Sequence, residues 1–192
     1  MTPHPASQPA GRLRPWTDSA DDIESILLAF GADDMAAQSG EPVNSEAAAR
    51  RWVAPWIDPD NGSAVAFAIE KDGVAVGHVM AGSIDCRNET AWVSYWVSSC
   101  ARGAGLASRA TAALAGHCFG TLGLFRLELA YRTNNPESAA VARNSGFVVE
   151  GLARAKLRYL DEQGLPERFD VQTCARLRSD GPARVIPLPI RP

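Results

Sequence analysis

The residues "YWVSSCARGAGLASRATAALAG", Tyr95 to Gly116, combine three local patterns. Tyr95 to Val97 alternate aromatic and β-branched residues like the end of a buried strand. Apolar residues between positions 106 and 114 recur at helical spacing, which predicts a helix. Between the strand and the helix lies Arg102-Gly103-Ala104-Gly105, a turn with almost no side-chain bulk.

Such a turn has two interpretations. The first amides of a helix lack internal partners and carry partial positive charge, so a glycine-rich turn before a helix can bind a phosphate group. Alternatively, the glycines serve only the geometry of a tight connection. The turn by itself favours neither interpretation over the other.

Length and composition predict one ordinary globular domain. The chain has 192 residues, of which 46% are hydrophobic and 21% are charged. No apolar run approaches the roughly 20 residues that span a bilayer, and no signal segment opens the chain, so we expect a cytoplasmic protein without a membrane partner. We expect a disordered tail over residues 1–11, a domain over 12–178 and a Pro-rich tail over 179–192.

Cysteines and histidines are too dispersed for a metal site or a disulfide framework. We therefore expect free thiols and no metal. The four cysteines are Cys86, Cys100, Cys118 and Cys174.

Charge is distributed unevenly along the chain. Residues 18–60 hold ten acidic residues against Arg50 and Arg51, whereas basic residues outnumber acidic ones over 102–178. Solvated helix faces explain both clusters, but the pair would also suit an anionic cofactor in one half and a cationic acceptor in the other. The basic half is too mixed in sign for a nucleic-acid groove, so we expect no nucleic-acid partner.

The order of predicted elements defines the fold class. Asp72-Gly73 is a strong hairpin turn, and Asn135-Pro136 together with Gly146 marks the two ends of a short helix. From the N-terminus we expect a strand at 12–16, a helix at 18–37, a helix from 45 to Trp52 or Trp56, a hairpin at 63–85, a strand at 90–99, a helix at 105–122, a strand at 124–132, a helix at 136–145 and two strands within 147–177. A strand-helix-strand unit demands a parallel pair and the hairpins demand antiparallel pairs, so this is an α+β (mixed α/β) fold with a mixed sheet.

Two motifs resemble the GNAT superfamily of N-acetyltransferases, most closely the RimJ/RimL-type branch of ribosomal-protein alanine acetyltransferases. The phosphate loop of that family is represented by Arg102, Gly105 and Ala107, and its second signature by Asn135, Ser138 and Gly146-Phe147. The resemblance covers about residues 12–177. It implies a mostly antiparallel sheet of about seven strands with a splayed parallel pair, flanked by about four helices.

The resemblance also implies acetyl-CoA as the donor and a set of residues that hold it. In this family the cofactor's amide-bearing arm fills the gap beside the splayed strand like an added strand. The expected cofactor-binding residues are Val97, Ser98, Ser99, Arg102, Gly103, Ala104, Gly105, Leu106, Ala107, Ser108, Asn135, Ser138 and Arg143, with Arg109 as a further candidate. Surface exposure of the arginines and helix capping by Asn135 are structural alternatives.

The reaction implied is direct acyl transfer from the thioester to an amine. Many relatives place a tyrosine that acts as the acid seven residues after the Asn of the second signature, which is Asn135 here. This chain has Ala142 at that position, so Ser138 becomes the expected acid. The base is less defined: His78 has a suitable pKa, although a lone strand histidine is often only packed. Tyr95, Glu89 or an ordered water are alternatives, and Cys100 could form an acyl-enzyme.

The acceptor stays open at this point. A protein N-terminus and a small-molecule amine such as a polyamine both fit, and a homodimer is a further expectation. A noncatalytic acyl-CoA-binding module, or a transferase that uses succinyl-CoA or another acyl donor, are the alternative functions.

Overall fold

One seven-stranded sheet forms the centre of the molecule, with the strand order β1-β2-β3-β4-β5-β7-β6. The structure is a computed structural model, and it describes residues 11–32, 35, 41–58, 61–160 and 163–191. The strands are β1 (Arg12–Arg14), β2 (Val65–Lys71), β3 (Val74–Asp85), β4 (Thr90–Val97), β5 (Arg126–Arg132), β6 (Val148–Leu160) and β7 (Pro166–Leu177). Neighbouring strands are antiparallel except β4 and β5, which are parallel. The predicted mixed, mostly antiparallel sheet is therefore confirmed.

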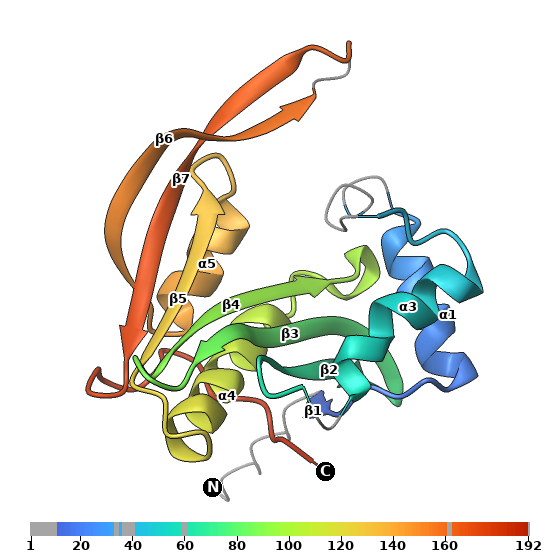
Figure 1. Cartoon of the computed structure of the whole chain (residues 1–192), viewed down its shortest axis with the longest axis horizontal. Helices are drawn as coiled ribbons and strands as arrows, with labels where there is room; N and C mark the ends of the chain where they lie inside the picture. Colours follow the sequence, from blue (N-terminus) through green and yellow to red (C-terminus); the bar gives the residue numbers. More distant parts are fainter. Residues whose placement is uncertain (1–10, 33–34, 36–40, 59–60, 161–162, 192) are drawn as a thin grey trace, which may run out of the picture.

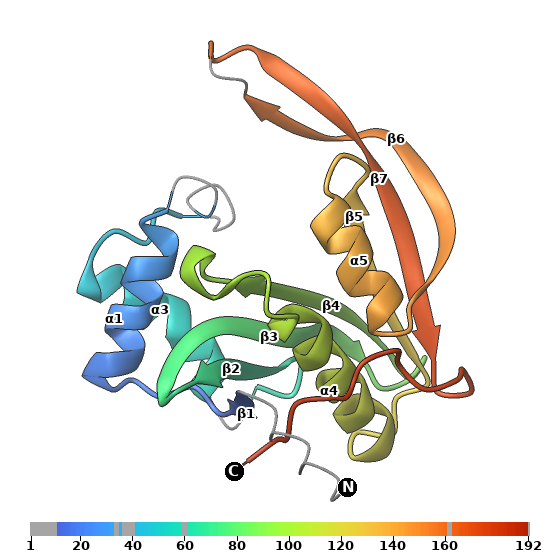
Figure 2. The ribbon, with the colours of Figure 1, turned by 180° about the vertical axis from the view of Figure 1, so that it is seen from behind.

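Helices cover both faces of this sheet (Figures 1 and 2). They are α1 (Ala20–Phe30), α3 (Glu46–Ile57), α4 (Leu106–Gly120) and α5 (Pro136–Asn144), with a short 3₁₀ turn η1 (Ser99–Ala101) before α4. Helices α1 and α3 contact each other and pack beside β2 and β3, whereas α4 and α5 lie together on the opposite face.

Local sequence signals explain three of the connections. Asp72 and Gly73 both have positive φ, 53° and 86°, as a two-residue turn between β2 and β3 requires. The Asn135 side chain caps α5 by accepting a hydrogen bond of 2.9 Å from the backbone N–H of Ser138. Gly146 follows α5 with a φ of 88°, a conformation that glycine adopts without strain.

Helix α1 is shorter than the sequence predicts. It begins after Ser19, whose side chain accepts from the amide of Asp22, and it ends at Phe30. The amide of Gly31 bonds back to the carbonyl of Leu27 and closes the last turn. The helix was predicted to continue to residue 37, but residues 33–34 and 36–37 lie outside the described part of the chain.

Two apolar cores lie on the two faces of the sheet. The core under α4 and α5 is mainly aliphatic and includes Leu114, Leu127 and Leu129, which are almost fully buried. The core under α1 and α3 is rich in aromatic rings and includes Trp16, Phe30 and Trp96.

The segment after β7 packs against the protein. The amide of Leu13 in β1 donates to the carbonyl of Pro189, and the amide of Arg191 donates to the carbonyl of Leu13. Leu188 is buried and its amide bonds to the carbonyl of Arg109 in α4. Of the tail predicted at the N-terminus, residues 1–10 lie outside the described residues.

Candidate active site

Strands β4 and β5 separate along their length and leave an open stretch of backbone. They pair through Thr90–Trp92 and residues 126–128, and the pairing ends there. Because the amide of Ser98 bonds to Val76 on β3, alternation directs the backbone groups of Val93, Tyr95 and Val97 away from β3, toward the gap beside β5. These groups could pair with a ligand that lies in the gap.

The glycine-rich turn lies at the open end of β4. Gly103 and Gly105 have φ values of 81° and 70°, so both adopt the left-handed conformation that disfavours other residues. Gly105 caps α4 without a side-chain hydrogen bond, which leaves the first amides of the helix, at Leu106 and the next two residues, without a partner in the helix. The turn is exposed, so it can bind an anion through backbone N–H groups.

Two arginine side chains near the turn bind backbone carbonyls of the protein. Arg102 donates from Nε to the carbonyl of Val97 at 2.9 Å, and Arg109 donates from Nε to the carbonyl of Ile186 at 3.1 Å. Ser108 is buried in the first turn of α4, where its amide has no partner within the helix. Arg143 is exposed in the last turn of α5.

A cluster of hydroxyl groups lies between the separated strands. Burial raises the pKa of the Tyr95 phenol on β4, and a hydrogen bond with Ser138 on α5 opposes this shift. The charges of Cys174 and Tyr131 raise this pKa further. The phenol is therefore protonated at neutral pH, and its partner belongs to the helix on the other side of the gap. Ala142, where many relatives carry tyrosine, is buried on the inner side of α5.

Sequence analysis missed Tyr131 and Cys174 as neighbours of this cluster. Burial raises the pKa of both groups, and their side chains are hydrogen-bonded to each other. The register of β5 against β7 brings them together, since Cys174 pairs with Leu129, two residues from Tyr131 on the same face. A correct prediction of that register was the one signal that could have identified them.

His78 lies far from this arrangement, on the α1–α3 face. Rings of Trp16, Trp52, Trp56 and Trp96 surround it, with centroids 5.1–6.1 Å from its own. Nδ1 of His78 accepts a hydrogen bond of 2.9 Å from the Trp16 indole, and burial lowers its pKa to about 3. These surroundings favour a packing role over the role of base suggested by the sequence.

The other candidates considered from sequence lie apart from the hydroxyl cluster. Glu89 precedes β4 at the end opposite to the glycine turn, and it lies 3.8 Å from Arg178. Cys100 is an exposed, free thiol in η1. All four cysteines are free, as predicted.

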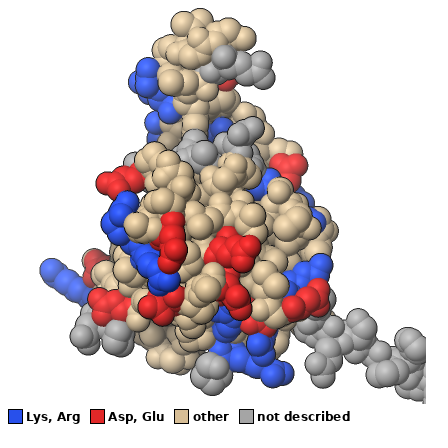
Figure 3. All heavy atoms as spheres, turned by 90° about the vertical axis from the view of Figure 1, so that its right-hand side faces the viewer, with Lys and Arg blue, Asp and Glu red and all other residues tan. Residues whose placement is uncertain are grey.

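Acidic side chains gather on the side formed by α1 and α3, with basic ones among them (Figure 3).

Asp22 differs from these surface carboxylates because it is buried. Arg14 binds Asp22 at 2.6 Å and also binds Glu70 at 2.7 Å. Burial alone would raise the pKa of Asp22, but hydrogen bonds from Arg14 and Thr17 outweigh it and the pKa falls. Asp22 therefore joins α1 to the sheet, and it is not part of a solvated face.

Metal-ligand clusters and membrane-spanning helices are both absent from the described residues. They contain no group of His, Cys, Asp and Glu side chains that could hold a metal ion. Among the helices described, none combines the length and the apolar character needed to cross a membrane.

Comparison with protein families supplies the identification. The model of the acetyltransferase (GNAT) domain matches residues 12–148. This chain belongs to the GNAT acetyltransferase family. Among curated proteins, the GNAT chain is 34% identical over 90 residues to a ribosomal-protein-serine acetyltransferase of Escherichia coli (strain K12). The match covers 47% of this chain and 50% of the relative, so it spans half the length of that protein.

Solved structures place this GNAT chain in the RimJ/RimL-like branch. It superposes on Mycobacterium smegmatis RimJ, in complex with CoA-disulfide, with a TM-score of 0.71, 26% identity and coverage of 88% of this chain and 87% of the other. A RimL ribosomal L7/L12 alpha-N-protein acetyltransferase, in complex with coenzyme A, gives a TM-score of 0.72 at 24% identity over 88% and 94%. At 24% identity, the similarity to the RimL structure shows that the two chains share a fold.

Proposed function

We propose that this protein is an acetyl-CoA-dependent N-acetyltransferase that transfers an acetyl group directly to a primary amine. The observation that carries the proposal is the separation of β4 from β5 beside the uncapped start of α4. The open backbone of Val93 and Tyr95, and the amide of Val97, would pair with the amide-bearing arm of CoA. The amides of residues 103–108 would bind its pyrophosphate. The catalytic domain would span residues 12–178, with the following segment packed on it.

In the proposed reaction, the neutral amine attacks the thioester carbonyl, the new C–N bond forms, and the C–S bond breaks. Charge develops on the carbonyl oxygen, and a backbone amide near Val97 would stabilise it. The attacking nitrogen loses one proton, and the CoA thiolate gains one. The overall products are an N-acetyl amine and CoA with a free thiol.

Tyr95 would donate the proton to the leaving thiolate, with Ser138 hydrogen-bonded to it. A phenol has a pKa near that of a thiol, about 10 against about 8.5, whereas an aliphatic hydroxyl is a far weaker acid. Burial raises the pKa of Tyr95 and keeps it protonated. Ser138, the acid expected from the family resemblance, would instead orient the phenol and link it to α5.

No side chain of the hydroxyl cluster suits the role of base. The pKa values of Tyr95, Tyr131 and Cys174 are all raised, so these groups hold their protons at neutral pH. We therefore propose that water near the separated strands accepts the proton of the amine. The acceptor would be a protein N-terminus or a small-molecule amine.

Calorimetry with CoA and a thiol-release assay with acetyl-CoA test the proposal together. We expect CoA to bind, and amines to accelerate thiol release. Gly105→Val should weaken CoA binding at least about tenfold, because valine is strained at a φ of 70° and shields the amides. Gly164→Val is the matched control, since Gly164 has a φ of 76° in the distant β6–β7 turn.

The outcomes separate the alternatives. Absence of CoA binding would overturn the proposal. Binding without thiol release across a broad amine panel would indicate a noncatalytic acyl-CoA-binding module. Release that requires succinyl-CoA in place of acetyl-CoA would indicate another acyl donor.

A further inference from the structure

An arginine packs against a pair of aromatic rings where β5 meets the β6–β7 hairpin. The guanidinium carbon of Arg132 is 4.7 Å from the ring centroid of Tyr159 and 5.3 Å from that of Phe169. The two rings meet edge to face, with centroids 5.8 Å apart. Arg132 belongs to β5, whereas the rings belong to β6 and β7, so the cluster joins three strands.

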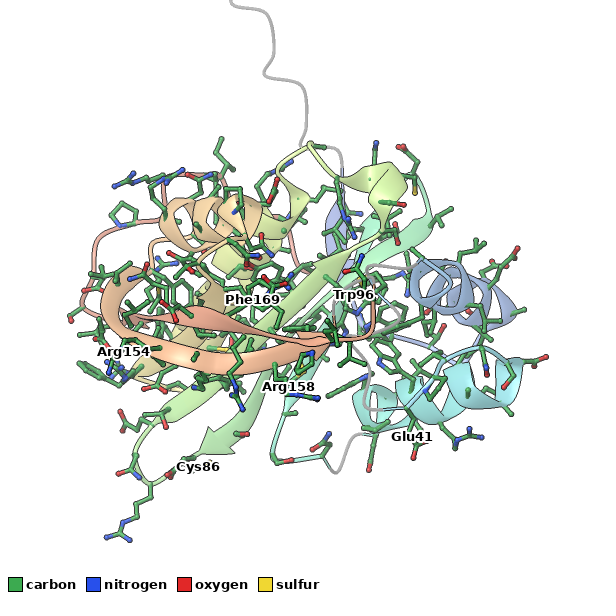
Figure 4. All side chains as sticks on the ribbon, turned by 90° about the horizontal axis from the view of Figure 1, so that it is seen from above. Glu41, Cys86, Trp96, Arg154, Arg158 and Phe169 are labelled. Atoms are coloured by element: carbon green, nitrogen blue, oxygen red, sulfur yellow. The ribbon has the colours of Figure 1, made fainter. Side chains whose placement is uncertain are left out.

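This cluster faces the side of the sheet that carries α1 and α3. Tyr131 lies on the α5 face with Cys174, and side chains of consecutive strand residues point to opposite faces. Arg132 therefore faces away from α5. The hairpin projects beyond the rest of the sheet and leans toward the side of α1 and α3 (Figure 1), and Phe169 and Arg158 lie along it in the view from above (Figure 4).

The guanidinium of Arg132 has aromatic neighbours but no charged partner among the described residues. Within the described part of the chain, no ion pair joins Arg132 to a carboxylate. Aromatic rings interact with the planar faces of a guanidinium, and the N–H groups at its edge can still bind a carboxylate through two parallel hydrogen bonds. The two rings also fix the orientation of the side chain, which reduces the entropy lost on binding.

The position of Arg132 relates it to the proposed reaction. It directly follows Tyr131 on β5, which is close enough to Tyr95 on β4 for its charge to raise the pKa of that phenol. The thioester would be held in the gap between these two strands. An extended peptide advances about 3.3 to 3.6 Å per residue, so a peptide whose N-terminal amine reaches the gap could bring its second or third residue to Arg132. A polyamine would meet a cation at this point.

We propose that Arg132 selects the acceptor by binding a carboxylate that lies close to the amine being acetylated. The inference rests on the proposed acetyltransferase function and narrows its acceptor class to acidic amino-terminal peptides. Tyr159 and Phe169 are positioning residues that hold the guanidinium. The acidic α1–α3 side would favour approach of the positively charged N-terminus, and Arg132 would favour the carboxylate that follows it.

Paired acceptors test this selectivity. The probes are two C-terminally amidated peptides that differ only by Glu or Gln at the second residue, a second pair that differs at the third residue, and spermidine. We expect wild-type protein to show a kcat/KM at least about tenfold higher for the Glu member of one pair, as one charge-assisted bidentate contact would give. Spermidine should be a poorer acceptor than either Glu peptide.

Variants of the hairpin assign the selectivity to Arg132. Arg132→Gln should reduce the Glu-to-Gln ratio to about one, whereas CoA binding by calorimetry stays unchanged. Arg158→Gln is the matched control, because it removes one positive charge from the neighbouring hairpin. Arg158 lies opposite Arg168 in the strand register and faces the other side of the sheet, so this variant should keep the wild-type ratio. The ratio compares two substrates of one variant, so a partly unfolded preparation does not alter it.

Three results would overturn the inference while the acetyltransferase proposal stands: equal rates within both peptide pairs, a preference that survives Arg132→Gln, or spermidine as the best acceptor. Absence of CoA binding in the wild-type protein would instead remove the proposed function and the inference with it. Calorimetry distinguishes that case from the other three.

Discussion

His78, which is buried, and Tyr95, which is partly buried, are titratable side chains on neighbouring strands, and they face opposite sides of the sheet. Burial lowers the pKa of His78 and raises the pKa of Tyr95, so it favours the neutral form of both side chains. His78 is enclosed by tryptophan rings and bonded to Trp16, whereas Tyr95 is bonded to Ser138 across a gap between strands. The difference teaches that a shifted pKa does not by itself identify a catalytic group. We expect changes on the α1–α3 face to affect stability and changes beside the gap to affect turnover.

The largest effect is expected for Arg14→Met on the α1–α3 face. This change leaves the buried carboxylate of Asp22 without a cation, whereas the buried Glu70 keeps only its ion pair with Arg12. Breaking such an arrangement should lower the free energy of unfolding by about 3 to 5 kcal/mol. Urea denaturation at neutral pH measures it, and the turnover of the folded fraction should stay at the wild-type value.

Arg50→Met is the control for that change. Arg50 pairs with Glu46 one helical turn away on the exposed surface of α3, and such pairs contribute about 0.5 kcal/mol or less. Equal destabilisation by the two variants would contradict the view that the buried ion pairs join α1 to the sheet.

Tyr95→Phe should have the largest effect on turnover beside the gap. Without the phenol, the thiolate leaves unprotonated, and kcat should fall about 100-fold, the lower range for loss of a general acid. Stopped-flow measurement of thiol release at saturating acetyl-CoA checks this, with calorimetry to show that CoA still binds. Tyr131→Phe serves as the control because its hydroxyl is bonded to Cys174. Loss of kcat in the control alone would reverse the assignment.

His78 should make the protein less stable as pH falls. Its pKa is about 3 in the native protein and about 6.5 when unfolded, so below pH 6.5 the unfolded state binds a proton that the native state does not. Stability should therefore decline by up to about 1.4 kcal/mol per pH unit between pH 6 and 4.5. His78→Asn keeps an acceptor for Trp16 and should remove this slope in urea denaturation curves. A slope that is the same in both proteins would assign it to other groups.

The smallest effect is expected for Ser138→Ala. The change removes a hydroxyl bonded to Tyr95 but keeps the backbone amide that Asn135 caps, so α5 should stay intact. We expect kcat to fall about tenfold, in line with the loss of one hydrogen bond to the acid. The pKa of Tyr95 should rise further, since Ser138 lowers it. An unchanged kcat across the pH range would remove Ser138 from the mechanism.

Local signals made most of the fold predictable. Asp72-Gly73 and Asn135-Pro136 determine the backbone within a few residues, so the hairpin and α5 follow from sequence alone. The end of α1 was predicted too late because the apolar pattern continues past Gly31, where the helix stops. The family resemblance, and not periodicity, supplied the separation of β4 from β5.

The site was less predictable because it depends on contacts between distant segments. The glycine turn and Asn135 can be identified within short windows of sequence. Tyr95 meets Ser138 only because β4 and α5 face each other across the gap, and the Tyr131–Cys174 contact requires the register of β5 against β7. Likewise, nothing local indicates that tryptophans from α3, β4 and the segment after β1 enclose His78.

The segment after β7 connects the helix that follows the glycine-rich turn to the edge strand β1. Arg109, one helical turn beyond Gly105, is held by both its carbonyl and its guanidinium to residues 186–188, and Pro189 continues onto Leu13. We therefore expect a ligand that binds at the first turn of α4 to restrain residues 186–191 as well. A fluorophore attached at residue 191 should therefore change its fluorescence anisotropy when a ligand binds at the turn, although it does not contact the ligand.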